Sequence, residues 1–169
     1  GRMKNVPLFY STSTVPAPVF NTASETAFAH SYTIPAYALN TLGGALRIKA
    51  NGRYTTTGTP LVNIRVKVGA LTIGEFISTT ANNATSTWQV VVETATRSLG
   101  SGGTVNIGYG LGQLGGVAAV TNSAFGTQSL DLTVNKIVTV TVTWAAADIA
   151  NAAYLDGFTV EWLYPGSTQ

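Results

Sequence analysis

The sequence contains unusually little charge. Only 9% of its residues are Asp, Glu, Lys or Arg, whereas soluble domains average about 25%. Threonine, serine, asparagine and glycine fill many of the remaining polar positions. A neutral hydroxyl surface produces little repulsion between molecules and is well suited to being covered by another protein surface. The composition therefore indicates an assembly protein rather than a freely diffusing enzyme.

Cysteine is absent, which excludes disulfides and thiolate-metal sites and leaves the redox compartment open. The sequence also lacks a run of about 18 apolar residues, so we expect no transmembrane helix and no membrane partner. The formal net charge of +2 is too small to indicate nucleic-acid binding. A chain of 169 residues is long enough for one domain with a sizeable core.

Groups that could carry catalysis are sparse. His30 is the only histidine, which excludes a His-rich metal site. As the base of a triad it would need a nucleophile such as Ser31, but no G-x-S-x-G elbow is present. The seven acids follow no recognisable motif, and the glycine-rich residues 108–116 precede no capped helix of the kind that binds phosphate. We therefore expect no enzymatic activity and no cofactor.

Strands are indicated instead by apolar residues that alternate with polar ones. This period of two predicts strands with one buried and one polar face, and it covers residues 46–54, 62–68, 88–93, 138–144 and 158–164. Turn signals fall at residues 43–44, 57–60, 69–70, 82–83, 100–103, 115–116 and 156–157. Residues 145–154 are interpreted as a loop with at most one helical turn. We expect an all-β fold of about eight or nine strands, an antiparallel β-sandwich for which a jelly roll is the favoured topology.

One predicted strand, residues 137–144, reads IVTVTVTW and contains neither charge nor proline. Such a segment would promote aggregation if it lay on an open sheet edge. We therefore expect a central strand, or an edge that another subunit covers. Ile137 and the threonines that share its outward face form a candidate contact surface.

Residues 1–23 are expected to form an extended N-terminal arm, and residues 24–169 the β-sandwich domain. Pro7, Pro16 and Pro18 exclude a regular helix in the arm, and its apolar residues are too many for a free tail. The arm either lies as an edge strand along its own domain or packs on a neighbouring subunit. The candidate anchors for a partner are Leu8, Phe9, Tyr10, Val19 and Phe20.

Basic residues concentrate in three stretches of the sequence. Six of the nine lysines and arginines are expected on outward strand faces, namely Arg47, Lys49, Arg53, Arg65, Lys67 and Arg97. If these strands share a sheet, one face carries a basic stripe. That stripe would be either an ordinary solvated face or a docking patch for an acidic surface such as a capsid shell or an anionic glycan.

Three blocks together resemble a group of tailed-phage virion proteins with a jelly-roll domain. The blocks are SYTIPA at residues 31–36, LRIKANGRYTTTGTP at 46–60 running into IRVKVG at 64–69, and WQVVVETATR at 88–97 ahead of GSGGT at 100–104. The group includes capsid decoration (cement) proteins and fibre or spike domains. The resemblance implies a homotrimer similar to the tumour-necrosis-factor arrangement, with aromatic-rich strand faces around its axis. Val160, Trp162 and Tyr164 are the candidates for that axis.

The resemblance leads to the hypothesis of a non-enzymatic phage protein on the capsid exterior. It would be a trimeric decoration protein that binds the major capsid protein or another virion protein and stabilises the assembled head. An alternative is a receptor- or carbohydrate-binding domain of a fibre or tail appendage, with Tyr37, Trp88 or Tyr109 stacking on sugars. A further alternative is a jelly-roll capsid protein.

Overall fold

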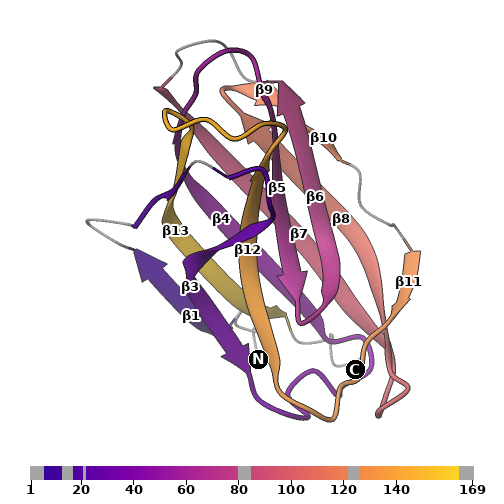
Figure 1. The fold of residues 1–169 in the computed structure, drawn as a ribbon. Coiled ribbons are helices and arrows are strands. Elements are labelled where there is room, and N and C mark those ends of the chain that lie inside the picture. Colours follow the sequence, from indigo (N-terminus) through magenta and orange to yellow (C-terminus); the bar gives the residue numbers. More distant parts are fainter. Residues whose placement is uncertain (1–5, 13–16, 21, 80–84, 122–125, 164–169) are drawn as a thin grey trace.

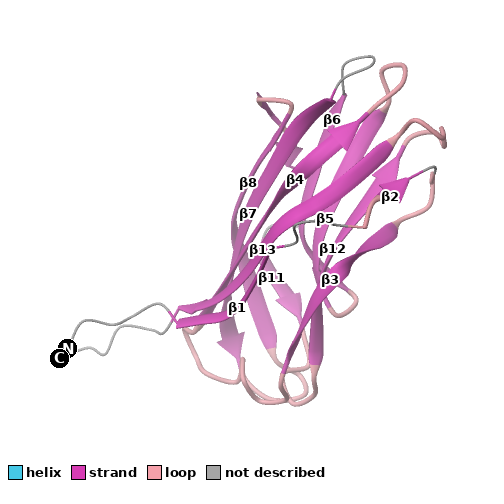
Figure 2. Ribbon diagram, turned by 90° about the vertical axis from the view of Figure 1, so that its left-hand side faces the viewer, coloured by secondary structure: helices cyan, strands magenta, loops and turns pink. Residues whose placement is uncertain are grey.

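The structure, a computed structural model, describes residues 6–12, 17–20, 22–79, 85–121 and 126–163. Every regular element in these residues is a β-strand (Figures 1 and 2). The all-β fold expected from the alternating sequence is therefore confirmed. Within these ranges, no helix has the length and apolar character needed to span a bilayer.

Nine strands contain seven residues or more, which agrees with the expected number. They are β1 (Val6–Thr12), β3 (Thr26–Ile34), β4 (Ala45–Thr55), β5 (Leu61–Val68), β6 (Leu71–Thr79), β7 (Thr85–Ser98), β8 (Thr104–Leu114), β12 (Lys136–Trp144) and β13 (Ala152–Leu163). Four shorter strands complete the described fold: β2 (Val19–Phe20), β9 (Val117–Ala118), β10 (Val120–Thr121) and β11 (Gly126–Ser129).

The strands form two antiparallel sheets that face each other as the layers of a β-sandwich (Figure 2). The eight-stranded sheet has the order β1-β13-β4-β7-β8-β11, with β2 beside β13 and β9 beside β8. The five-stranded sheet has the order β10-β6-β5-β12-β3. Strand β12 thus lies between two neighbours, which confirms that its uncharged apolar sequence belongs to a central strand.

The core lies between the sheets and is built by the alternation that the sequence displays. On β4, β5 and β12 the apolar set points inward, and Ile48, Ile64 and Val140 are each 0% exposed. Trp88 stacks on Phe28 with ring centroids 5.8 Å apart. The Trp88 Nε1 donates a hydrogen bond of 3.1 Å to the carbonyl oxygen of Tyr154, so the indole is satisfied although it is buried.

The strand pairs are nested along the chain. Strands β5 and β6 form a hairpin, which β4 and β7 enclose as the next pair. That pair is enclosed in turn by β3 and β12, and β1 and β13 form the outermost pair. Strands β8 to β11 are inserted between β7 and β12. The two ends of the described chain therefore meet at one edge of the eight-stranded sheet (Figure 1).

The N-terminal segment belongs to this sheet. Strand β1 pairs with β13 of the same chain from Val6↔Trp162 to Thr12↔Gly157, and β2 continues along the same strand at Ala152 and Ala153. The interpretation as an edge strand on its own domain is therefore confirmed for these residues. The side chains of Leu8, Phe9 and Tyr10 lie outside the described part of the structure. Val19 faces the core, whereas Phe20 is 56% exposed.

The structure confirms most of the loop predicted from residue 145 and contradicts the turn predicted at residues 156–157. Residues 145–151 form a loop with one turn, closed by a 3.0 Å hydrogen bond from the Asn151 N–H to the Asp148 carbonyl, as expected. The loop prediction is wrong for residues 152–154, which belong to β13. The turn predicted at residues 156–157 is wrong, because Asp156 and Gly157 lie inside β13 at a shift in its register with β4. An Asp-Gly pair suits a β-bulge as well as a turn. The turn signal at 82–83 falls outside the described residues.

Candidate functional site

The six basic residues of the expected stripe do not share a face. Strands β4 and β7, which carry Arg47, Lys49, Arg53 and Arg97, belong to the eight-stranded sheet. Strand β5, which carries Arg65 and Lys67, belongs to the other sheet. The expectation of one continuous stripe is therefore wrong, because the chain crosses from one sheet to the other between β4 and β5.

Acids also neutralise most of these cations. On the eight-stranded sheet Arg47 pairs with Glu93 and Glu161, Lys49 with Glu161, and Arg53 with Asp156. On the other sheet Arg65 pairs with Glu25 and Glu75, and Lys67 with Glu25. Five cations thus meet five acids, and both outer faces are close to neutral. Among the described residues, Arg97 is exposed and makes no ion pair with any of these acids.

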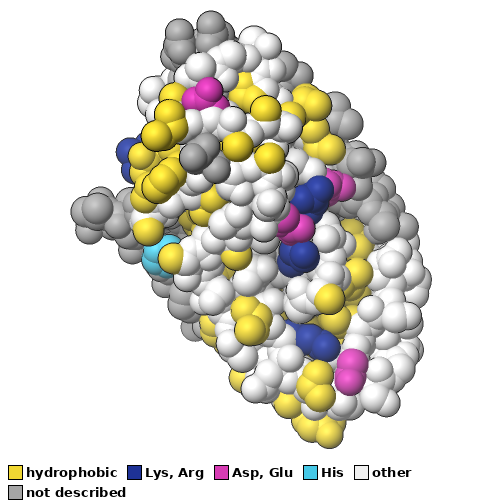
Figure 3. Space-filling view, viewed as in Figure 1, with side chains coloured by type: hydrophobic (Ala, Val, Ile, Leu, Met, Phe, Trp, Pro, Cys, Tyr) yellow, Lys and Arg dark blue, Asp and Glu magenta, His cyan; other side chains and the backbone are white. Residues whose placement is uncertain are grey.

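The outer face of the five-stranded sheet is the more uniform of the two, and we call it the hydroxyl face. It is defined by the outward side chains of β12, namely Ile137, Thr139, Thr141 and Thr143, together with those of β5 beside it. Figure 3 shows this face, on which blue and magenta side chains adjoin each other near the centre and a few more charged side chains lie toward its ends. Ile137 is 50% exposed.

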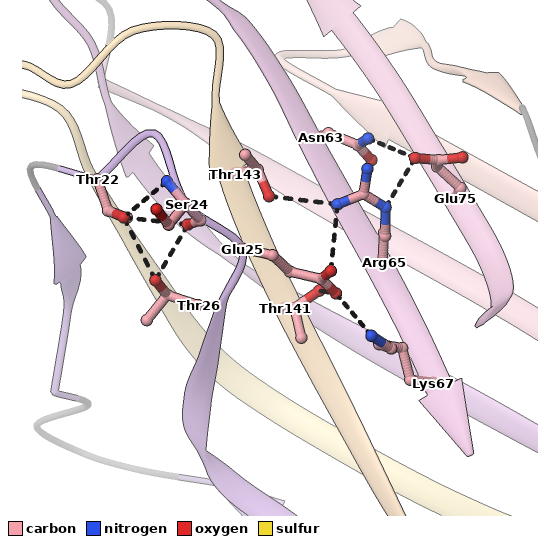
Figure 4. A network of polar contacts seen from close by, with 10 residues as sticks. All are labelled: Thr22, Ser24, Glu25, Thr26, Asn63, Arg65, Lys67, Glu75, Thr141 and Thr143. Carbon is pink, nitrogen blue, oxygen red and sulfur yellow. Dashed lines mark hydrogen bonds and ion pairs between the residues drawn. The ribbon is translucent and has the colours of Figure 1, made fainter. Parts of the chain in front are cut away.

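The central charges of the hydroxyl face form a network that joins three strands (Figure 4). Glu25, directly before β3, accepts hydrogen bonds of 2.8 Å from Thr141 and 3.1 Å from Lys67. The Arg65 Nε donates 2.7 Å to Glu75, and its Nη1 lies 3.7 Å from Glu25. Asn63 donates to the same oxygen of Glu75. The network ties the start of an edge strand across β12 to β5.

The environment of Glu25 lowers the pKa of its carboxyl. Burial of the carboxyl is the largest single effect and raises the pKa, but it is outweighed by the hydrogen bonds from Thr141 and Lys67 and by the charges of Lys67 and Arg65. The folded state therefore binds this proton more weakly than the unfolded chain does.

A depressed pKa makes Glu25 a source of acid sensitivity. Its stabilising contribution is fully present above the ordinary value of 4.5 and is lost as the pH falls through the lower folded value. We expect Glu25→Gln to destabilise the protein at pH 7 and to differ much less from the wild type near pH 3. Urea unfolding at both pH values measures this. An equal difference in stability between Glu25→Gln and the wild type at the two pH values would contradict this expectation. Thr141→Val should also destabilise the protein at pH 7, but by less than Glu25→Gln does.

The candidate trimer axis is not on the surface of the chain. Val160 is 0% and Trp162 4% exposed, because both point between the sheets. Their assignment to an intersubunit axis is wrong, since contact with another subunit would require the core to open. Tyr164 lies outside the described residues. A sequence can indicate the apolar face of a strand without telling a core from an interface.

The aromatic residues considered for sugar stacking differ in their exposure to solvent. Trp88 is 2% exposed and belongs to the core, so it cannot stack on a ligand. Tyr37 is 63% exposed and has a φ of 64°. The side chain of Tyr109 lies outside the described residues. His30 is half-buried on β3, and Ser31 follows it on the exposed side.

All seven acids of the chain are engaged in structural contacts. Five form the ion pairs given above. Asp131 accepts hydrogen bonds from the N–H and the hydroxyl of Thr133, and Asp148 accepts one from the N–H of Ala150. In the described ranges no three His, Cys, Asp or Glu side chains gather in a way that could hold a metal ion.

Several residues on the outer faces of the two sheets could not be identified as neighbours from the sequence. Glu25 precedes the first alternating strand and gives no local sign that it reaches two strands away. Asn51, Gln89 and Gln113 are brought into one row by strand register. Only the last two belong to one hairpin, and its register could have indicated that they meet.

No protein-family model matches the chain, and no curated protein matches its sequence.

Proposed function

We propose that the chain is a non-enzymatic structural protein of a tailed-phage virion. In this proposal it forms a homotrimer on the capsid exterior and binds the major capsid protein or another virion protein. The nested strand pairs β1/β13, β3/β12, β4/β7 and β5/β6 support the jelly-roll assignment, since a jelly roll folds eight strands as two Greek keys. They thereby support the resemblance on which the virion assignment depends.

The observation that carries the proposal is the neutrality of both outer faces. Five of the nine cations pair with five of the seven acids on the strands. This leaves four cations and two acids, and with them the whole net charge of +2, outside these pairs. Faces without net charge repel a second protein surface less than faces with a large net charge do. The engagement of every acid also supports a role without acid–base catalysis.

The mechanism of such a protein is mass action. A protein that binds only the assembled shell stabilises that shell by RT ln(1 + [L]/Kd), about 4 kcal/mol at a thousandfold excess over Kd. Three copies held together multiply the effect through avidity. Self-association is therefore part of the function, and we assign one side of the contact between copies to the hydroxyl face.

The mass in solution tests this proposal. Light scattering at micromolar concentration should give three times 17.5 kDa. Ile137→Glu should reduce the mass to that of one chain, because it places a charge in the covered face. Leu111→Glu is the matched control, since Leu111 is also 50% exposed but lies on β8 in the other sheet. A wild type that stays monomeric, or two variants with equal effects, would contradict the proposal.

A further inference from the structure

A hollow on the outer face of the eight-stranded sheet lies over β4, β7, β8 and β13. Its volume is about 440 Å³, within the range of roughly 300–1,000 Å³ typical of small-ligand pockets. The polar side chains that line it are Asn51, Arg53, Thr87, Gln89, Gln113 and Asp156. None of them belongs to the hydroxyl face, which is on the opposite side of the sandwich.

Three carboxamides cross the floor of this pocket in a single row. Asn51 is directly opposite Gln89, and Gln89 is directly opposite Gln113. The row is continued on β13 by Gly157, the partner of Asn51. Because adjacent strands are about 4.8 Å apart, the amides repeat at a spacing close to the length of one pyranose unit in an extended polysaccharide.

The row is held in place before any ligand binds. The Gln89 Nε2 donates a 2.9 Å hydrogen bond to the Gln113 Oε1. Asn51 lies against Gly157, where an added Cβ would be 2.8 Å from the Asn51 Oδ1. The bulge at Asp156 aims this carboxylate at Arg53, which donates to it at 2.9 and 3.0 Å. The Arg53 guanidinium also lies 4.9 Å from the centre of the Tyr154 ring.

The chemistry of the pocket favours a neutral ligand rich in hydroxyl groups. Among the described residues that line the pocket, Arg53 and Asp156 are the charged ones, and they neutralise each other. Each carboxamide offers both donors and an acceptor, as a row of sugar hydroxyls requires. A peptide strand would need an unpaired sheet edge, whereas the backbone of β4 and β7 is paired on both sides here. We propose that this pocket binds an extended neutral oligosaccharide that lies across the strands along the amide row.

Titration of the ¹⁵N-labelled protein with a panel of neutral oligosaccharides tests the proposal. The panel contains linear trimers to pentamers of glucose, galactose, mannose, rhamnose and N-acetylglucosamine. At least one member should give saturable shifts with millimolar or tighter affinity. Gln89→Ala and Gln113→Ala should each weaken binding at least tenfold, since both side chains are exposed and can be removed without disturbing the core.

Two further variants test whether oligosaccharide binding depends on the amide row of this pocket. Asn106→Ala removes a carboxamide from the same face of β8 but outside this pocket, and it should bind as the wild type does. Gly157→Ala should keep the fold and weaken binding, because only the movable end of Asn51 must shift. Absence of saturable binding across the panel, or binding that Gln89→Ala and Gln113→Ala leave unchanged, would overturn the proposal. The mass measurements on Ile137→Glu are independent, so the two proposals can fail separately.

Discussion

Replacement of Gly52 with alanine should prevent β4 and β13 from pairing in their native register. Gly52 is opposite Leu155 on β13 and Trp88 on β7. An added Cβ would overlap the carbonyl oxygen of Tyr154 and would lie 2.9 Å from the Trp88 Cε2. It would therefore occupy the place where the indole donates its hydrogen bond to that carbonyl. Neither neighbour can move away without a large loss of folding free energy, because one is backbone and the other is a core side chain.

The expected cost is more than about 3 kcal/mol, above the usual range for an overpacked site. That is a large part of the stability of a typical domain, about 5–15 kcal/mol. Thermal and urea unfolding of soluble Gly52→Ala measure it, and failure to fold is the extreme of the same outcome. Gly108→Ala is the matched control on the same sheet, because its Cβ would be 3.6 Å from the nearest atom. We expect it to change stability by less than about 1 kcal/mol. A Gly52→Ala protein as stable as this control would contradict the argument.

Removal of the Arg65 side chain should cause the second largest loss of folding stability. Its side chain is 24% exposed, and the carboxylate of Glu75 beside it is 16% exposed. Without the guanidinium, Glu75 loses its ion pair, and Glu25 loses one of its two cations. Breaking a buried pair costs about 3–5 kcal/mol. We expect about 2–3 kcal/mol for Arg65→Met, since this network remains in partial contact with water.

Two further variants serve as controls for Arg65→Met. Arg65→Met combined with Glu75→Gln should recover more than half of the lost stability, because residue 75 then carries no charge that needs the guanidinium. Arg53→Met removes an arginine from another ion pair, but that arginine is 51% exposed, so its loss should destabilise the protein much less than Arg65→Met does. Equal losses for Arg53→Met and Arg65→Met would show that burial of the pair does not determine its contribution. Urea midpoints at pH 7 are the measurement for all three variants.

The sequence was sufficient to predict five of the long strands, β4, β5, β7, β12 and β13, and which of their faces is apolar. Alternation identified Ile48, Ile64 and Val140 as inward residues. The uncharged apolar run predicted that β12 is either central or an edge covered by another subunit, and the structure shows that it is central. Both signals are local, because burial on one face requires a period of two wherever the strand lies. The structure confirms the β-sandwich on these grounds.

The arrangement of strands was not predictable in the same way. Residues 56–60 carry the chain from one sheet to the other, whereas Gly69 and Ala70 turn it within a sheet. Both links contain glycine, and their composition does not reveal which kind of connection each makes. Arg53 and Arg65 therefore seemed to share a face that does not exist. The amide row was missed for a related reason, since register between β4 and β7 depends on the whole sheet.

The nested order of strand pairs also has a consequence for biosynthesis. During synthesis β1 and β3 emerge before the other long strands of this sandwich, yet their partners β13 and β12 are the last of its strands to be translated. The hairpin of β5 and β6 is the earliest of the nested pairs that can close. Strands β1 and β3 must remain without their native partners until β13 and β12 have been translated, when the two outermost pairs can form.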